Sequence, residues 1–159
     1  MASKIAVGAK APSFTLPRDG GGEVSLSEFR GQKLVLYFYP KADTPGCTRE
    51  AIDFSKLSGA FARAGTAVLG VSADPVTRQD KFKTKHKLNF PLGSDDTGKV
   101  TEDYGVWVEK SMYGRKYMGI ERATYLIDGK GVIRGIWRKV KVPGHVDEVL
   151  KEAKKLADA

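Results

Sequence analysis

A single cysteine, Cys47, directly follows Thr44-Pro45-Gly46, and this order of residue types is suited to making a nucleophilic thiolate. Thr44 has the chemistry of a helix N-cap, since its hydroxyl can accept a hydrogen bond from a backbone N–H two or three residues later. Pro45 then falls at the first helical position, where the missing N–H costs nothing. Cys47 is accordingly predicted in the first turn, where unpaired N–H groups and the positive end of the helix dipole favour an anion.

The alternative is that Cys47 is only a small buried hydrophobic residue, as lone cysteines often are. A structural cysteine usually lies among apolar residues inside an element. Cys47 instead lies between Gly46 and Thr48, at a turn rich in Pro, Asp and Thr. This context favours a functional thiol.

Two apolar runs and a helical stripe surround this cysteine in the sequence. Residues 33–39 form a continuous apolar and aromatic run, which predicts a strand covered on both faces, and residues 66–72 predict a second buried strand. Between them, apolar residues at helical spacing predict a helix that begins at Pro45 and ends near Gly65.

The rest of the chain continues the alternation of strands and helices. A second helix is expected after Asp74-Pro75, a turn at 95–98, a hairpin of strands 124–127 and 132–137, and a last helix from His145. Segments 12–17 and 24–26 predict an N-terminal hairpin. The sequence therefore predicts an α/β protein of thioredoxin-like fold, with a central mixed β-sheet, helices on both faces and an N-terminal β extension. Residues 1–159 are expected to form one domain.

The pattern Pro-x-x-x-Thr-x-x-Cys, formed by Pro40, Thr44 and Cys47, resembles the active-site motif of the peroxiredoxins. The resemblance is specifically to the bacterioferritin comigratory protein, or peroxiredoxin Q, subfamily, and it extends from about Val7 to Leu156. The further segments that carry it are Gly70-Val71-Ser72-Ala73-Asp74, Phe90-Pro91-Leu92, Tyr104-Gly105-Val106-Trp107, Glu109-Lys110-Ser111-Met112-Tyr113-Gly114-Arg115 and Glu121-Arg122-Ala123-Thr124-Tyr125-Leu126-Ile127-Asp128.

The resemblance implies a thiol-dependent peroxidase that reduces hydrogen peroxide and organic hydroperoxides. Cys47 would attack the peroxide and become a sulfenic acid, and Thr44 would hold the peroxide in line. Arg122 would stabilise the thiolate and the charge on the leaving oxygen, while Pro40 would shield the pocket from water. Each partner also has a purely structural explanation: Thr44 as a cap, Arg122 in a surface ion pair with Glu121, and Pro40 as the end of a strand.

Many members of the subfamily carry a second, resolving cysteine, and this chain does not. The corresponding positions are Ile52, five residues after Cys47, and the neighbourhood of Lys83 on the next helix. The sequence therefore predicts a one-cysteine mechanism in which an external thiol reductant, such as thioredoxin, glutaredoxin or glutathione, completes the cycle. The resemblance also implies a monomer.

Composition restricts the other classes of partner. The formal charge is +8, but Lys and Arg are scattered and carry no nucleic-acid motif, so a solvated basic surface is expected rather than nucleic-acid binding. The two distant histidines, His86 and His145, offer no metal-ligand spacing and are expected to be packing or surface residues; no cofactor is expected. No apolar run suggests a membrane span or secretory signal, and a chain with one cysteine is expected in the reducing cytoplasm.

Two rival functions remain at this level. A monothiol transferase would exchange with glutathione mixed disulfides, although such a substrate needs no arginine clamp. A holdase or peroxide sensor would pass its oxidation to a partner. The aromatic residues Tyr104, Trp107, Tyr113 and Tyr117 are expected in the core or at its rim, with a wall of the active site or a docking surface as the alternative.

Overall fold

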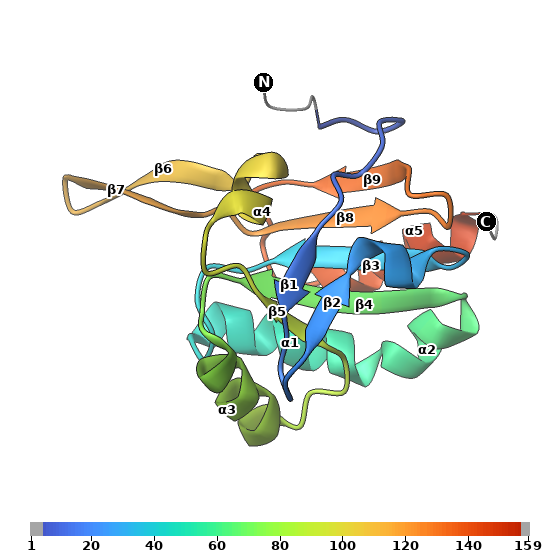
Figure 1. Cartoon of the computed structure of the whole chain (residues 1–159), viewed down its shortest axis with the longest axis horizontal. Coiled ribbons are helices and arrows are strands. Elements are labelled where there is room, and N and C mark those ends of the chain that lie inside the picture. The colour runs from blue at the N-terminus through green and yellow to red at the C-terminus, as the bar shows by residue number, and fades with distance from the viewer. Residues whose placement is uncertain (1–4, 157–159) are drawn as a thin grey trace.

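The computed structural model of the protein describes residues 5–156 (Figure 1). Its strands are β1 (Thr15–Pro17), β2 (Glu23–Ser25), β3 (Lys33–Phe38), β4 (Thr66–Ser72), β5 (Leu92–Ser94), β6 (Trp107–Met112), β7 (Arg115–Ile120), β8 (Ala123–Ile127) and β9 (Ile133–Trp137). Its helices are α1 (Pro45–Lys56), α2 (Ser58–Arg63), α3 (Val76–His86), α4 (Lys99–Asp103) and α5 (His145–Lys155), with a 3₁₀ helix η1 (Leu26–Phe29).

Five strands form a central mixed sheet in the order β5-β4-β3-β8-β9. β3 pairs in parallel with β4 and β4 with β5, whereas β8 runs antiparallel to both β3 and β9. The predicted buried strands 33–39 and 66–72 are thereby confirmed as the two neighbouring strands at the middle of the sheet, and every residue of β3 is buried. The mixed sheet predicted from the sequence is confirmed, as are the N-terminal β1–β2 hairpin and the β8–β9 hairpin.

The two faces of the sheet carry separate apolar cores. Because side chains alternate along a strand, Val35 and Tyr37 of β3 join one core while Leu34, Leu36 and Phe38 join the other. Helices α1, α2, α3 and α5 pack on this face and contribute to the first core, together with residues of β4, β5 and β8. The second face is covered by β1, β2 and residues of α4, which lie in front of the sheet in Figure 1.

The helix predicted from Pro45 to near Gly65 is wrong in one respect, because the structure divides it into α1 and α2. The break follows from a contact with the loop after α3. The Asn89 side chain donates to the Ser55 carbonyl (3.3 Å) and to the Ser58 hydroxyl (2.8 Å). A polar group that enters the helical ladder in this way interrupts the regular i→i−4 bonding.

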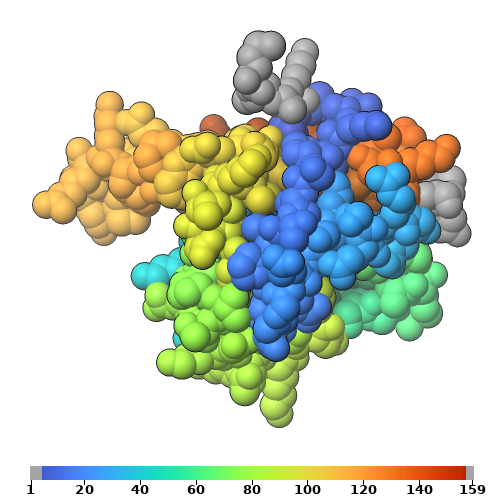
Figure 2. All heavy atoms as spheres, viewed as in Figure 1, coloured from blue at the N-terminus to red at the C-terminus, as the bar shows by residue number. Residues whose placement is uncertain are grey.

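The hairpin of β6 and β7 was not predicted from the sequence. Tyr113 and Gly114, both with positive φ, form the two-residue turn that joins Met112 to Arg115. Figures 1 and 2 show this hairpin projecting from the body of the molecule. Tyr113 is 98% exposed, so it does not belong to the core or its rim, whereas Tyr104 is fully buried as expected.

Candidate active site

The ends of three central strands bring the predicted site residues together. The register of the sheet pairs Phe38, the last residue of β3, with Ala123, the first residue of β8, and with Val71 near the end of β4. The loop and helix after β3 therefore meet Arg122, which directly precedes β8, at one edge of the sheet. Crevices at the carboxyl ends of parallel strands are common sites of ligand binding.

The first turn of α1 has the predicted arrangement around Cys47. Thr44 is the N-cap residue with extended backbone, and Pro45 is the first helical residue. Cys47 is a free cysteine and only 1% exposed. Its sulfur therefore lies at the start of a twelve-residue helix, at the positive end of the helix dipole.

The capping bond predicted for Thr44 is wrong. Within residues 5–156, the Thr44 side chain makes no hydrogen bond to the first turn of α1. Its hydroxyl instead donates to the backbone carbonyl of Lys41 (2.8 Å). The hydroxyl oxygen thereby keeps its lone pairs available to accept a hydrogen bond from a ligand.

Arg122 lies against the sulfur of Cys47, from which it is separated by 75 residues in the sequence. Its Nη2 is 3.3 Å from Cys47 Sγ, and its Nη1 donates to Glu50 Oε1 at 2.8 Å. The alternative of a surface ion pair with Glu121 is wrong, because Glu121 pairs with Arg138. Burial alone would lower the pKa of Arg122, but the charges of Glu50 and Cys47 raise it above its usual range, so the guanidinium stays charged.

Glu50 is a site residue that the sequence reasoning missed. It lies three residues after Cys47 on α1 and is fully buried. Burial raises the pKa of Glu50 to about 7 in spite of the opposing charge of Arg122. Its Oε2 atom and the hydroxyl of Tyr37 are buried without a hydrogen-bond partner among residues 5–156. An ionisable residue on the same helical face as the cysteine was the available signal.

We expect the stability of the protein to fall as pH rises from about 4.5, the unperturbed pKa of a glutamate, to about 7, and this fall to depend on Glu50. In that window the folded chain keeps a proton that the unfolded chain has released, so the free energy of the unfolded state falls relative to that of the folded state. The total change is about 3 kcal/mol.

Urea unfolding of the protein and of Glu50→Gln at several pH values measures this difference. The glutamine has no proton to release and still offers Arg122 an acceptor, so the Glu50→Gln curve should lack this component. Equal pH slopes for the two proteins would contradict the assignment.

Lys110 is a second cation near the sulfur that the sequence did not single out for chemistry. Its aliphatic carbons lie over Gly119 of the neighbouring strand, where an added Cβ would meet Lys110 Cδ at 3.3 Å. Burial and the charge of Arg122 lower the pKa of Lys110, while the charge of Cys47 opposes this shift. The β6–β7 hairpin thus adds positive charge to the surroundings of Cys47.

The remaining residues named from the sequence lie as follows. Pro40 is half-buried between the end of β3 and the loop that leads to α1, and its shielding role stays a prediction. Ile52 lies on α1, and the Lys83 ammonium forms an ion pair with Asp19 at 2.8 Å.

The two histidines make packing and polar contacts. The ring of His86 packs on Phe82, and its Nε2 lies 2.9 Å from Asp43 Oδ1. His145 is the first residue of α5, and its ring forms a hydrogen bond with the Thr124 hydroxyl.

Within residues 5–156, no group of three or more His, Cys, Asp or Glu side chains is arranged to hold a metal ion. Each helix of that same part of the chain is too short or too polar to cross a membrane.

Comparisons with known proteins agree with this geometry. Residues 7–136 match the AhpC/TSA family. The chain is 47% identical over 154 residues to peroxiredoxin Bcp of Bacillus subtilis, covering 97% of this chain and 98% of that one. It is 42% identical over 153 residues to peroxiredoxin Bcp of Escherichia coli, covering 96% and 98%.

Solved structures of similar proteins share the fold. A cysteine-to-serine mutant of Xylella fastidiosa PrxQ superposes with a TM-score of 0.91 at 39% identity, covering 96% of this chain and 98% of that one. A Xanthomonas campestris bacterioferritin comigratory protein, studied for its alkyl peroxide reduction activity, superposes with a TM-score of 0.86 at 44% identity, covering 89% and 90%. The thioredoxin-like fold predicted from the sequence is thereby confirmed.

Proposed function

Because this chain belongs to the AhpC/TSA family, as a one-cysteine member of the Bcp/peroxiredoxin Q group, it is a thiol-dependent peroxidase, and we propose that Cys47 is the sulfur that reduces the peroxide. The observation that carries the proposal is the 3.3 Å contact between Arg122 Nη2 and Cys47 Sγ at the first turn of α1. A guanidinium and a helix N-terminus both place positive charge beside this one sulfur, and such surroundings are typical of nucleophilic cysteines.

The reaction that this arrangement supports is a displacement at oxygen. The Cys47 thiolate attacks the nearer oxygen of the peroxide, an S–O bond forms, and the O–O bond breaks with its electron pair on the farther oxygen. That oxygen takes a proton and leaves as water or an alcohol, and the cysteine is left as a sulfenic acid. The sulfur is oxidised by two electrons and the peroxide is reduced by two.

Arg122 and Thr44 have separate roles in this step. The guanidinium stabilises the thiolate and the negative charge that develops on the leaving oxygen. The Thr44 oxygen, whose proton points to Lys41, accepts a hydrogen bond from the peroxide and holds its O–O axis in line. Pro40 shields the peroxide site beside Cys47 from water. The substrates are hydrogen peroxide and organic hydroperoxides.

Because Cys47 is the only cysteine of the chain, external thiols must reduce the sulfenic acid. A first thiol displaces water and forms a mixed disulfide with Cys47, and a second thiol attacks that disulfide, so that the Cys47 thiol is released and the two external sulfurs leave as a disulfide. Thioredoxin, glutaredoxin and glutathione are the proposed reductants, and the protein acts as a monomer in the cytoplasm. Cys47 is 1% exposed, so the first turn of α1 must open before a second sulfur can reach it.

Peroxide consumption with dithiothreitol as the only reductant tests the proposal. We expect continuous turnover, and we expect dimedone to label Cys47 after one equivalent of peroxide, with Cys47→Ser as the unreactive blank. A monothiol transferase would instead release glutathione from a mixed disulfide without consuming peroxide. A holdase or a sensor would not turn over. Failure to consume peroxide would remove the peroxidase assignment for this chain.

A further inference from the structure

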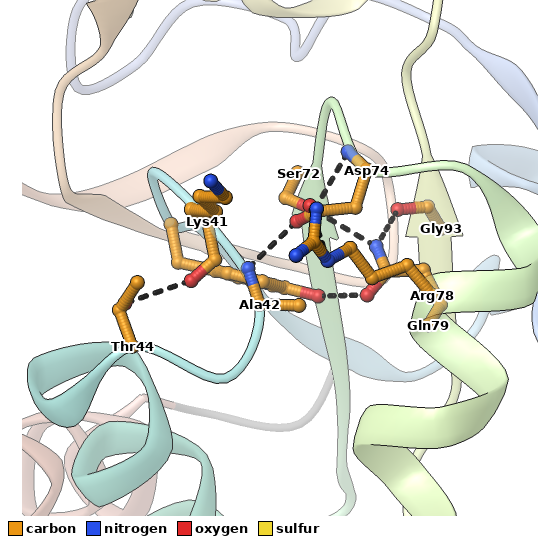
Figure 3. Close-up of polar contacts among 9 residues, drawn as sticks. Lys41, Ala42, Thr44, Ser72, Asp74, Arg78, Gln79 and Gly93 are labelled. Atoms are coloured by element: carbon orange, nitrogen blue, oxygen red, sulfur yellow. Dashed lines mark hydrogen bonds and ion pairs between the residues drawn. The ribbon is translucent and has the colours of Figure 1, made fainter.

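The loop between β3 and α1 is fastened to the end of β4 by a buried carboxylate, Asp74. One carboxylate oxygen, Oδ2, accepts the backbone N–H of Ala42 at 2.7 Å and the hydroxyl of Ser72 at 2.7 Å. Asp74 is only 8% exposed and Ala42 only 2%. Figure 3 shows these contacts converging on Asp74 from the loop and from β4.

The peptide group that Asp74 holds also binds Thr44. The N–H of Ala42 and the carbonyl of Lys41 belong to one peptide unit, which is planar and trans. Its N–H end donates to Asp74, and its C=O end accepts the hydroxyl of Thr44 at 2.8 Å (Figure 3). Because the unit is rigid, the direction of the Ala42 N–H fixes the direction of the Lys41 carbonyl.

We propose that Asp74 is a positioning residue for the peroxidase reaction, which orients the Thr44 hydroxyl through the Lys41–Ala42 peptide. This inference rests on the proposed function, in which the Thr44 oxygen receives the peroxide. A carboxylate at the N–H end polarises the peptide and makes its carbonyl a better acceptor. The Thr44 proton is thereby committed to Lys41, and the lone pairs of its oxygen face the ligand.

The hydrogen bonds around Asp74 fix the orientation of its carboxylate. The amide nitrogen of Gln79 donates to Ser72 Oγ (2.9 Å) and to the carbonyl of Gly93 (2.9 Å). Because Ser72 Oγ accepts a hydrogen bond from Gln79, its own hydroxyl proton is donated to Asp74. The amide oxygen of Gln79 accepts the hydroxyl of Tyr39, the residue that begins the loop. The hydrogen bonds from Tyr39 to Gln79, from Gln79 to Ser72 and from Ser72 to Asp74 Oδ2 therefore all point toward Asp74, within a buried cluster.

The other carboxylate oxygen offers a matched control. Oδ1 lies 3.9 Å from Arg78 Nε, and the Arg78 side chain is 51% exposed. Arg78→Ala removes this ion pair and leaves both bonds of Oδ2 in place. We expect it to have no effect on the peroxide reaction.

The test is a double-mutant cycle between Asp74 and Thr44, with the rate of the peroxide reaction as the readout. Asp74→Ala frees the peptide and should slow the reaction of Cys47 with hydrogen peroxide by about 10–100-fold. Asp74→Asn keeps an oxygen for Ala42 and should recover most of the rate. In a Thr44→Val background, which has no hydroxyl to orient, Asp74→Ala should cause no further loss.

Alkylation of Cys47 by iodoacetamide separates positioning from a general effect on the fold. This reaction needs the thiolate but no hydrogen bond from the reagent to Thr44, so its rate should be unchanged in Asp74→Ala. If alkylation and peroxide reduction fall together, or if the losses from Asp74→Ala and Thr44→Val multiply, the proposal is wrong.

The experiment also distinguishes failure of the proposed function from failure of the inference about Asp74. If the unsubstituted protein consumes no peroxide, the proposed function fails, whatever Asp74 does. If Asp74→Ala does not fold, Asp74→Asn carries the same cycle. Its smaller loss must also vanish in the Thr44→Val background, and persistence of that loss would overturn the inference.

Discussion

Replacing Arg122 with alanine is expected to slow the reaction of Cys47 with hydrogen peroxide by about 10²–10³-fold. Within residues 5–156, the guanidinium is the one charged group in hydrogen-bond contact with the sulfur, at 3.3 Å. It is charged before the reaction begins and requires no reorganisation when negative charge moves from sulfur to the leaving oxygen. Loss of free thiol after rapid mixing with peroxide measures the rate.

Arg122→Ala needs a control for the Glu50 carboxylate, which loses its partner in this variant. Without Arg122, Glu50 remains buried beside an empty space, and breaking a buried ion pair can destabilise a protein by about 3–5 kcal/mol. The double variant Arg122→Ala, Glu50→Gln removes both charges. It should recover stability but not rate, because the effect on rate arises at the sulfur.

Arg138→Ala is the matched arginine control. Arg138 pairs with Glu121, the neighbour of Arg122 in the sequence, and also donates to the carbonyl of Gly105. Its removal should leave the peroxide rate unchanged. Equal rates for Arg122→Ala and the unsubstituted protein would remove Arg122 from the reaction, and equal losses in Arg122→Ala and Arg138→Ala would indicate a general effect of surface charge.

The parts of the fold that were predictable are those with a strong local signal. β3 and β4 were identified because a strand buried on both faces reads as an unbroken apolar run. The start of α1 followed from Pro45, whose fixed φ suits the first helical position. Cys47 could be placed in the first turn by counting from Pro45, with no knowledge of the sheet.

The parts that were missed depend on residues distant in the sequence. The break between α1 and α2 is made by Asn89, 31 residues after Ser58. A glutamate in a helix is usually exposed, so the sequence gives no reason to expect Glu50 to be buried. Its burial is compensated by the ion pair with Arg122, which lies beside α1 in the fold. The Thr44 hydroxyl bonds Lys41 rather than the helix, and the peptide group that accepts this bond is itself bonded to Asp74, which follows another strand.

Excess hydrogen peroxide without a reductant is expected to inactivate this protein completely and irreversibly. After one equivalent of peroxide, Cys47 should carry a single oxygen and remain a sulfenic acid, because the chain contains no second thiol that could condense with it. Further peroxide carries a waiting sulfenic acid to the sulfinic form, which thiols do not reduce. Intact-mass spectrometry across a peroxide titration should show one added oxygen, then two, as activity is lost.

A cysteine introduced at Ile52 should protect the protein, but only if α1 unwinds. Residues five apart on a helix have Cα atoms about 8–9 Å apart, whereas a disulfide spans at most about 7 Å. Ile52→Cys should therefore form an internal disulfide after one equivalent of peroxide at a rate set by opening of the first turns of α1. Ile52→Ser, which makes a similar change in size without a thiol, should be inactivated like the unsubstituted protein. If the unsubstituted protein passes directly to a disulfide-linked dimer, the sulfenic acid does not wait, and the resolving thiol is Cys47 of a second copy.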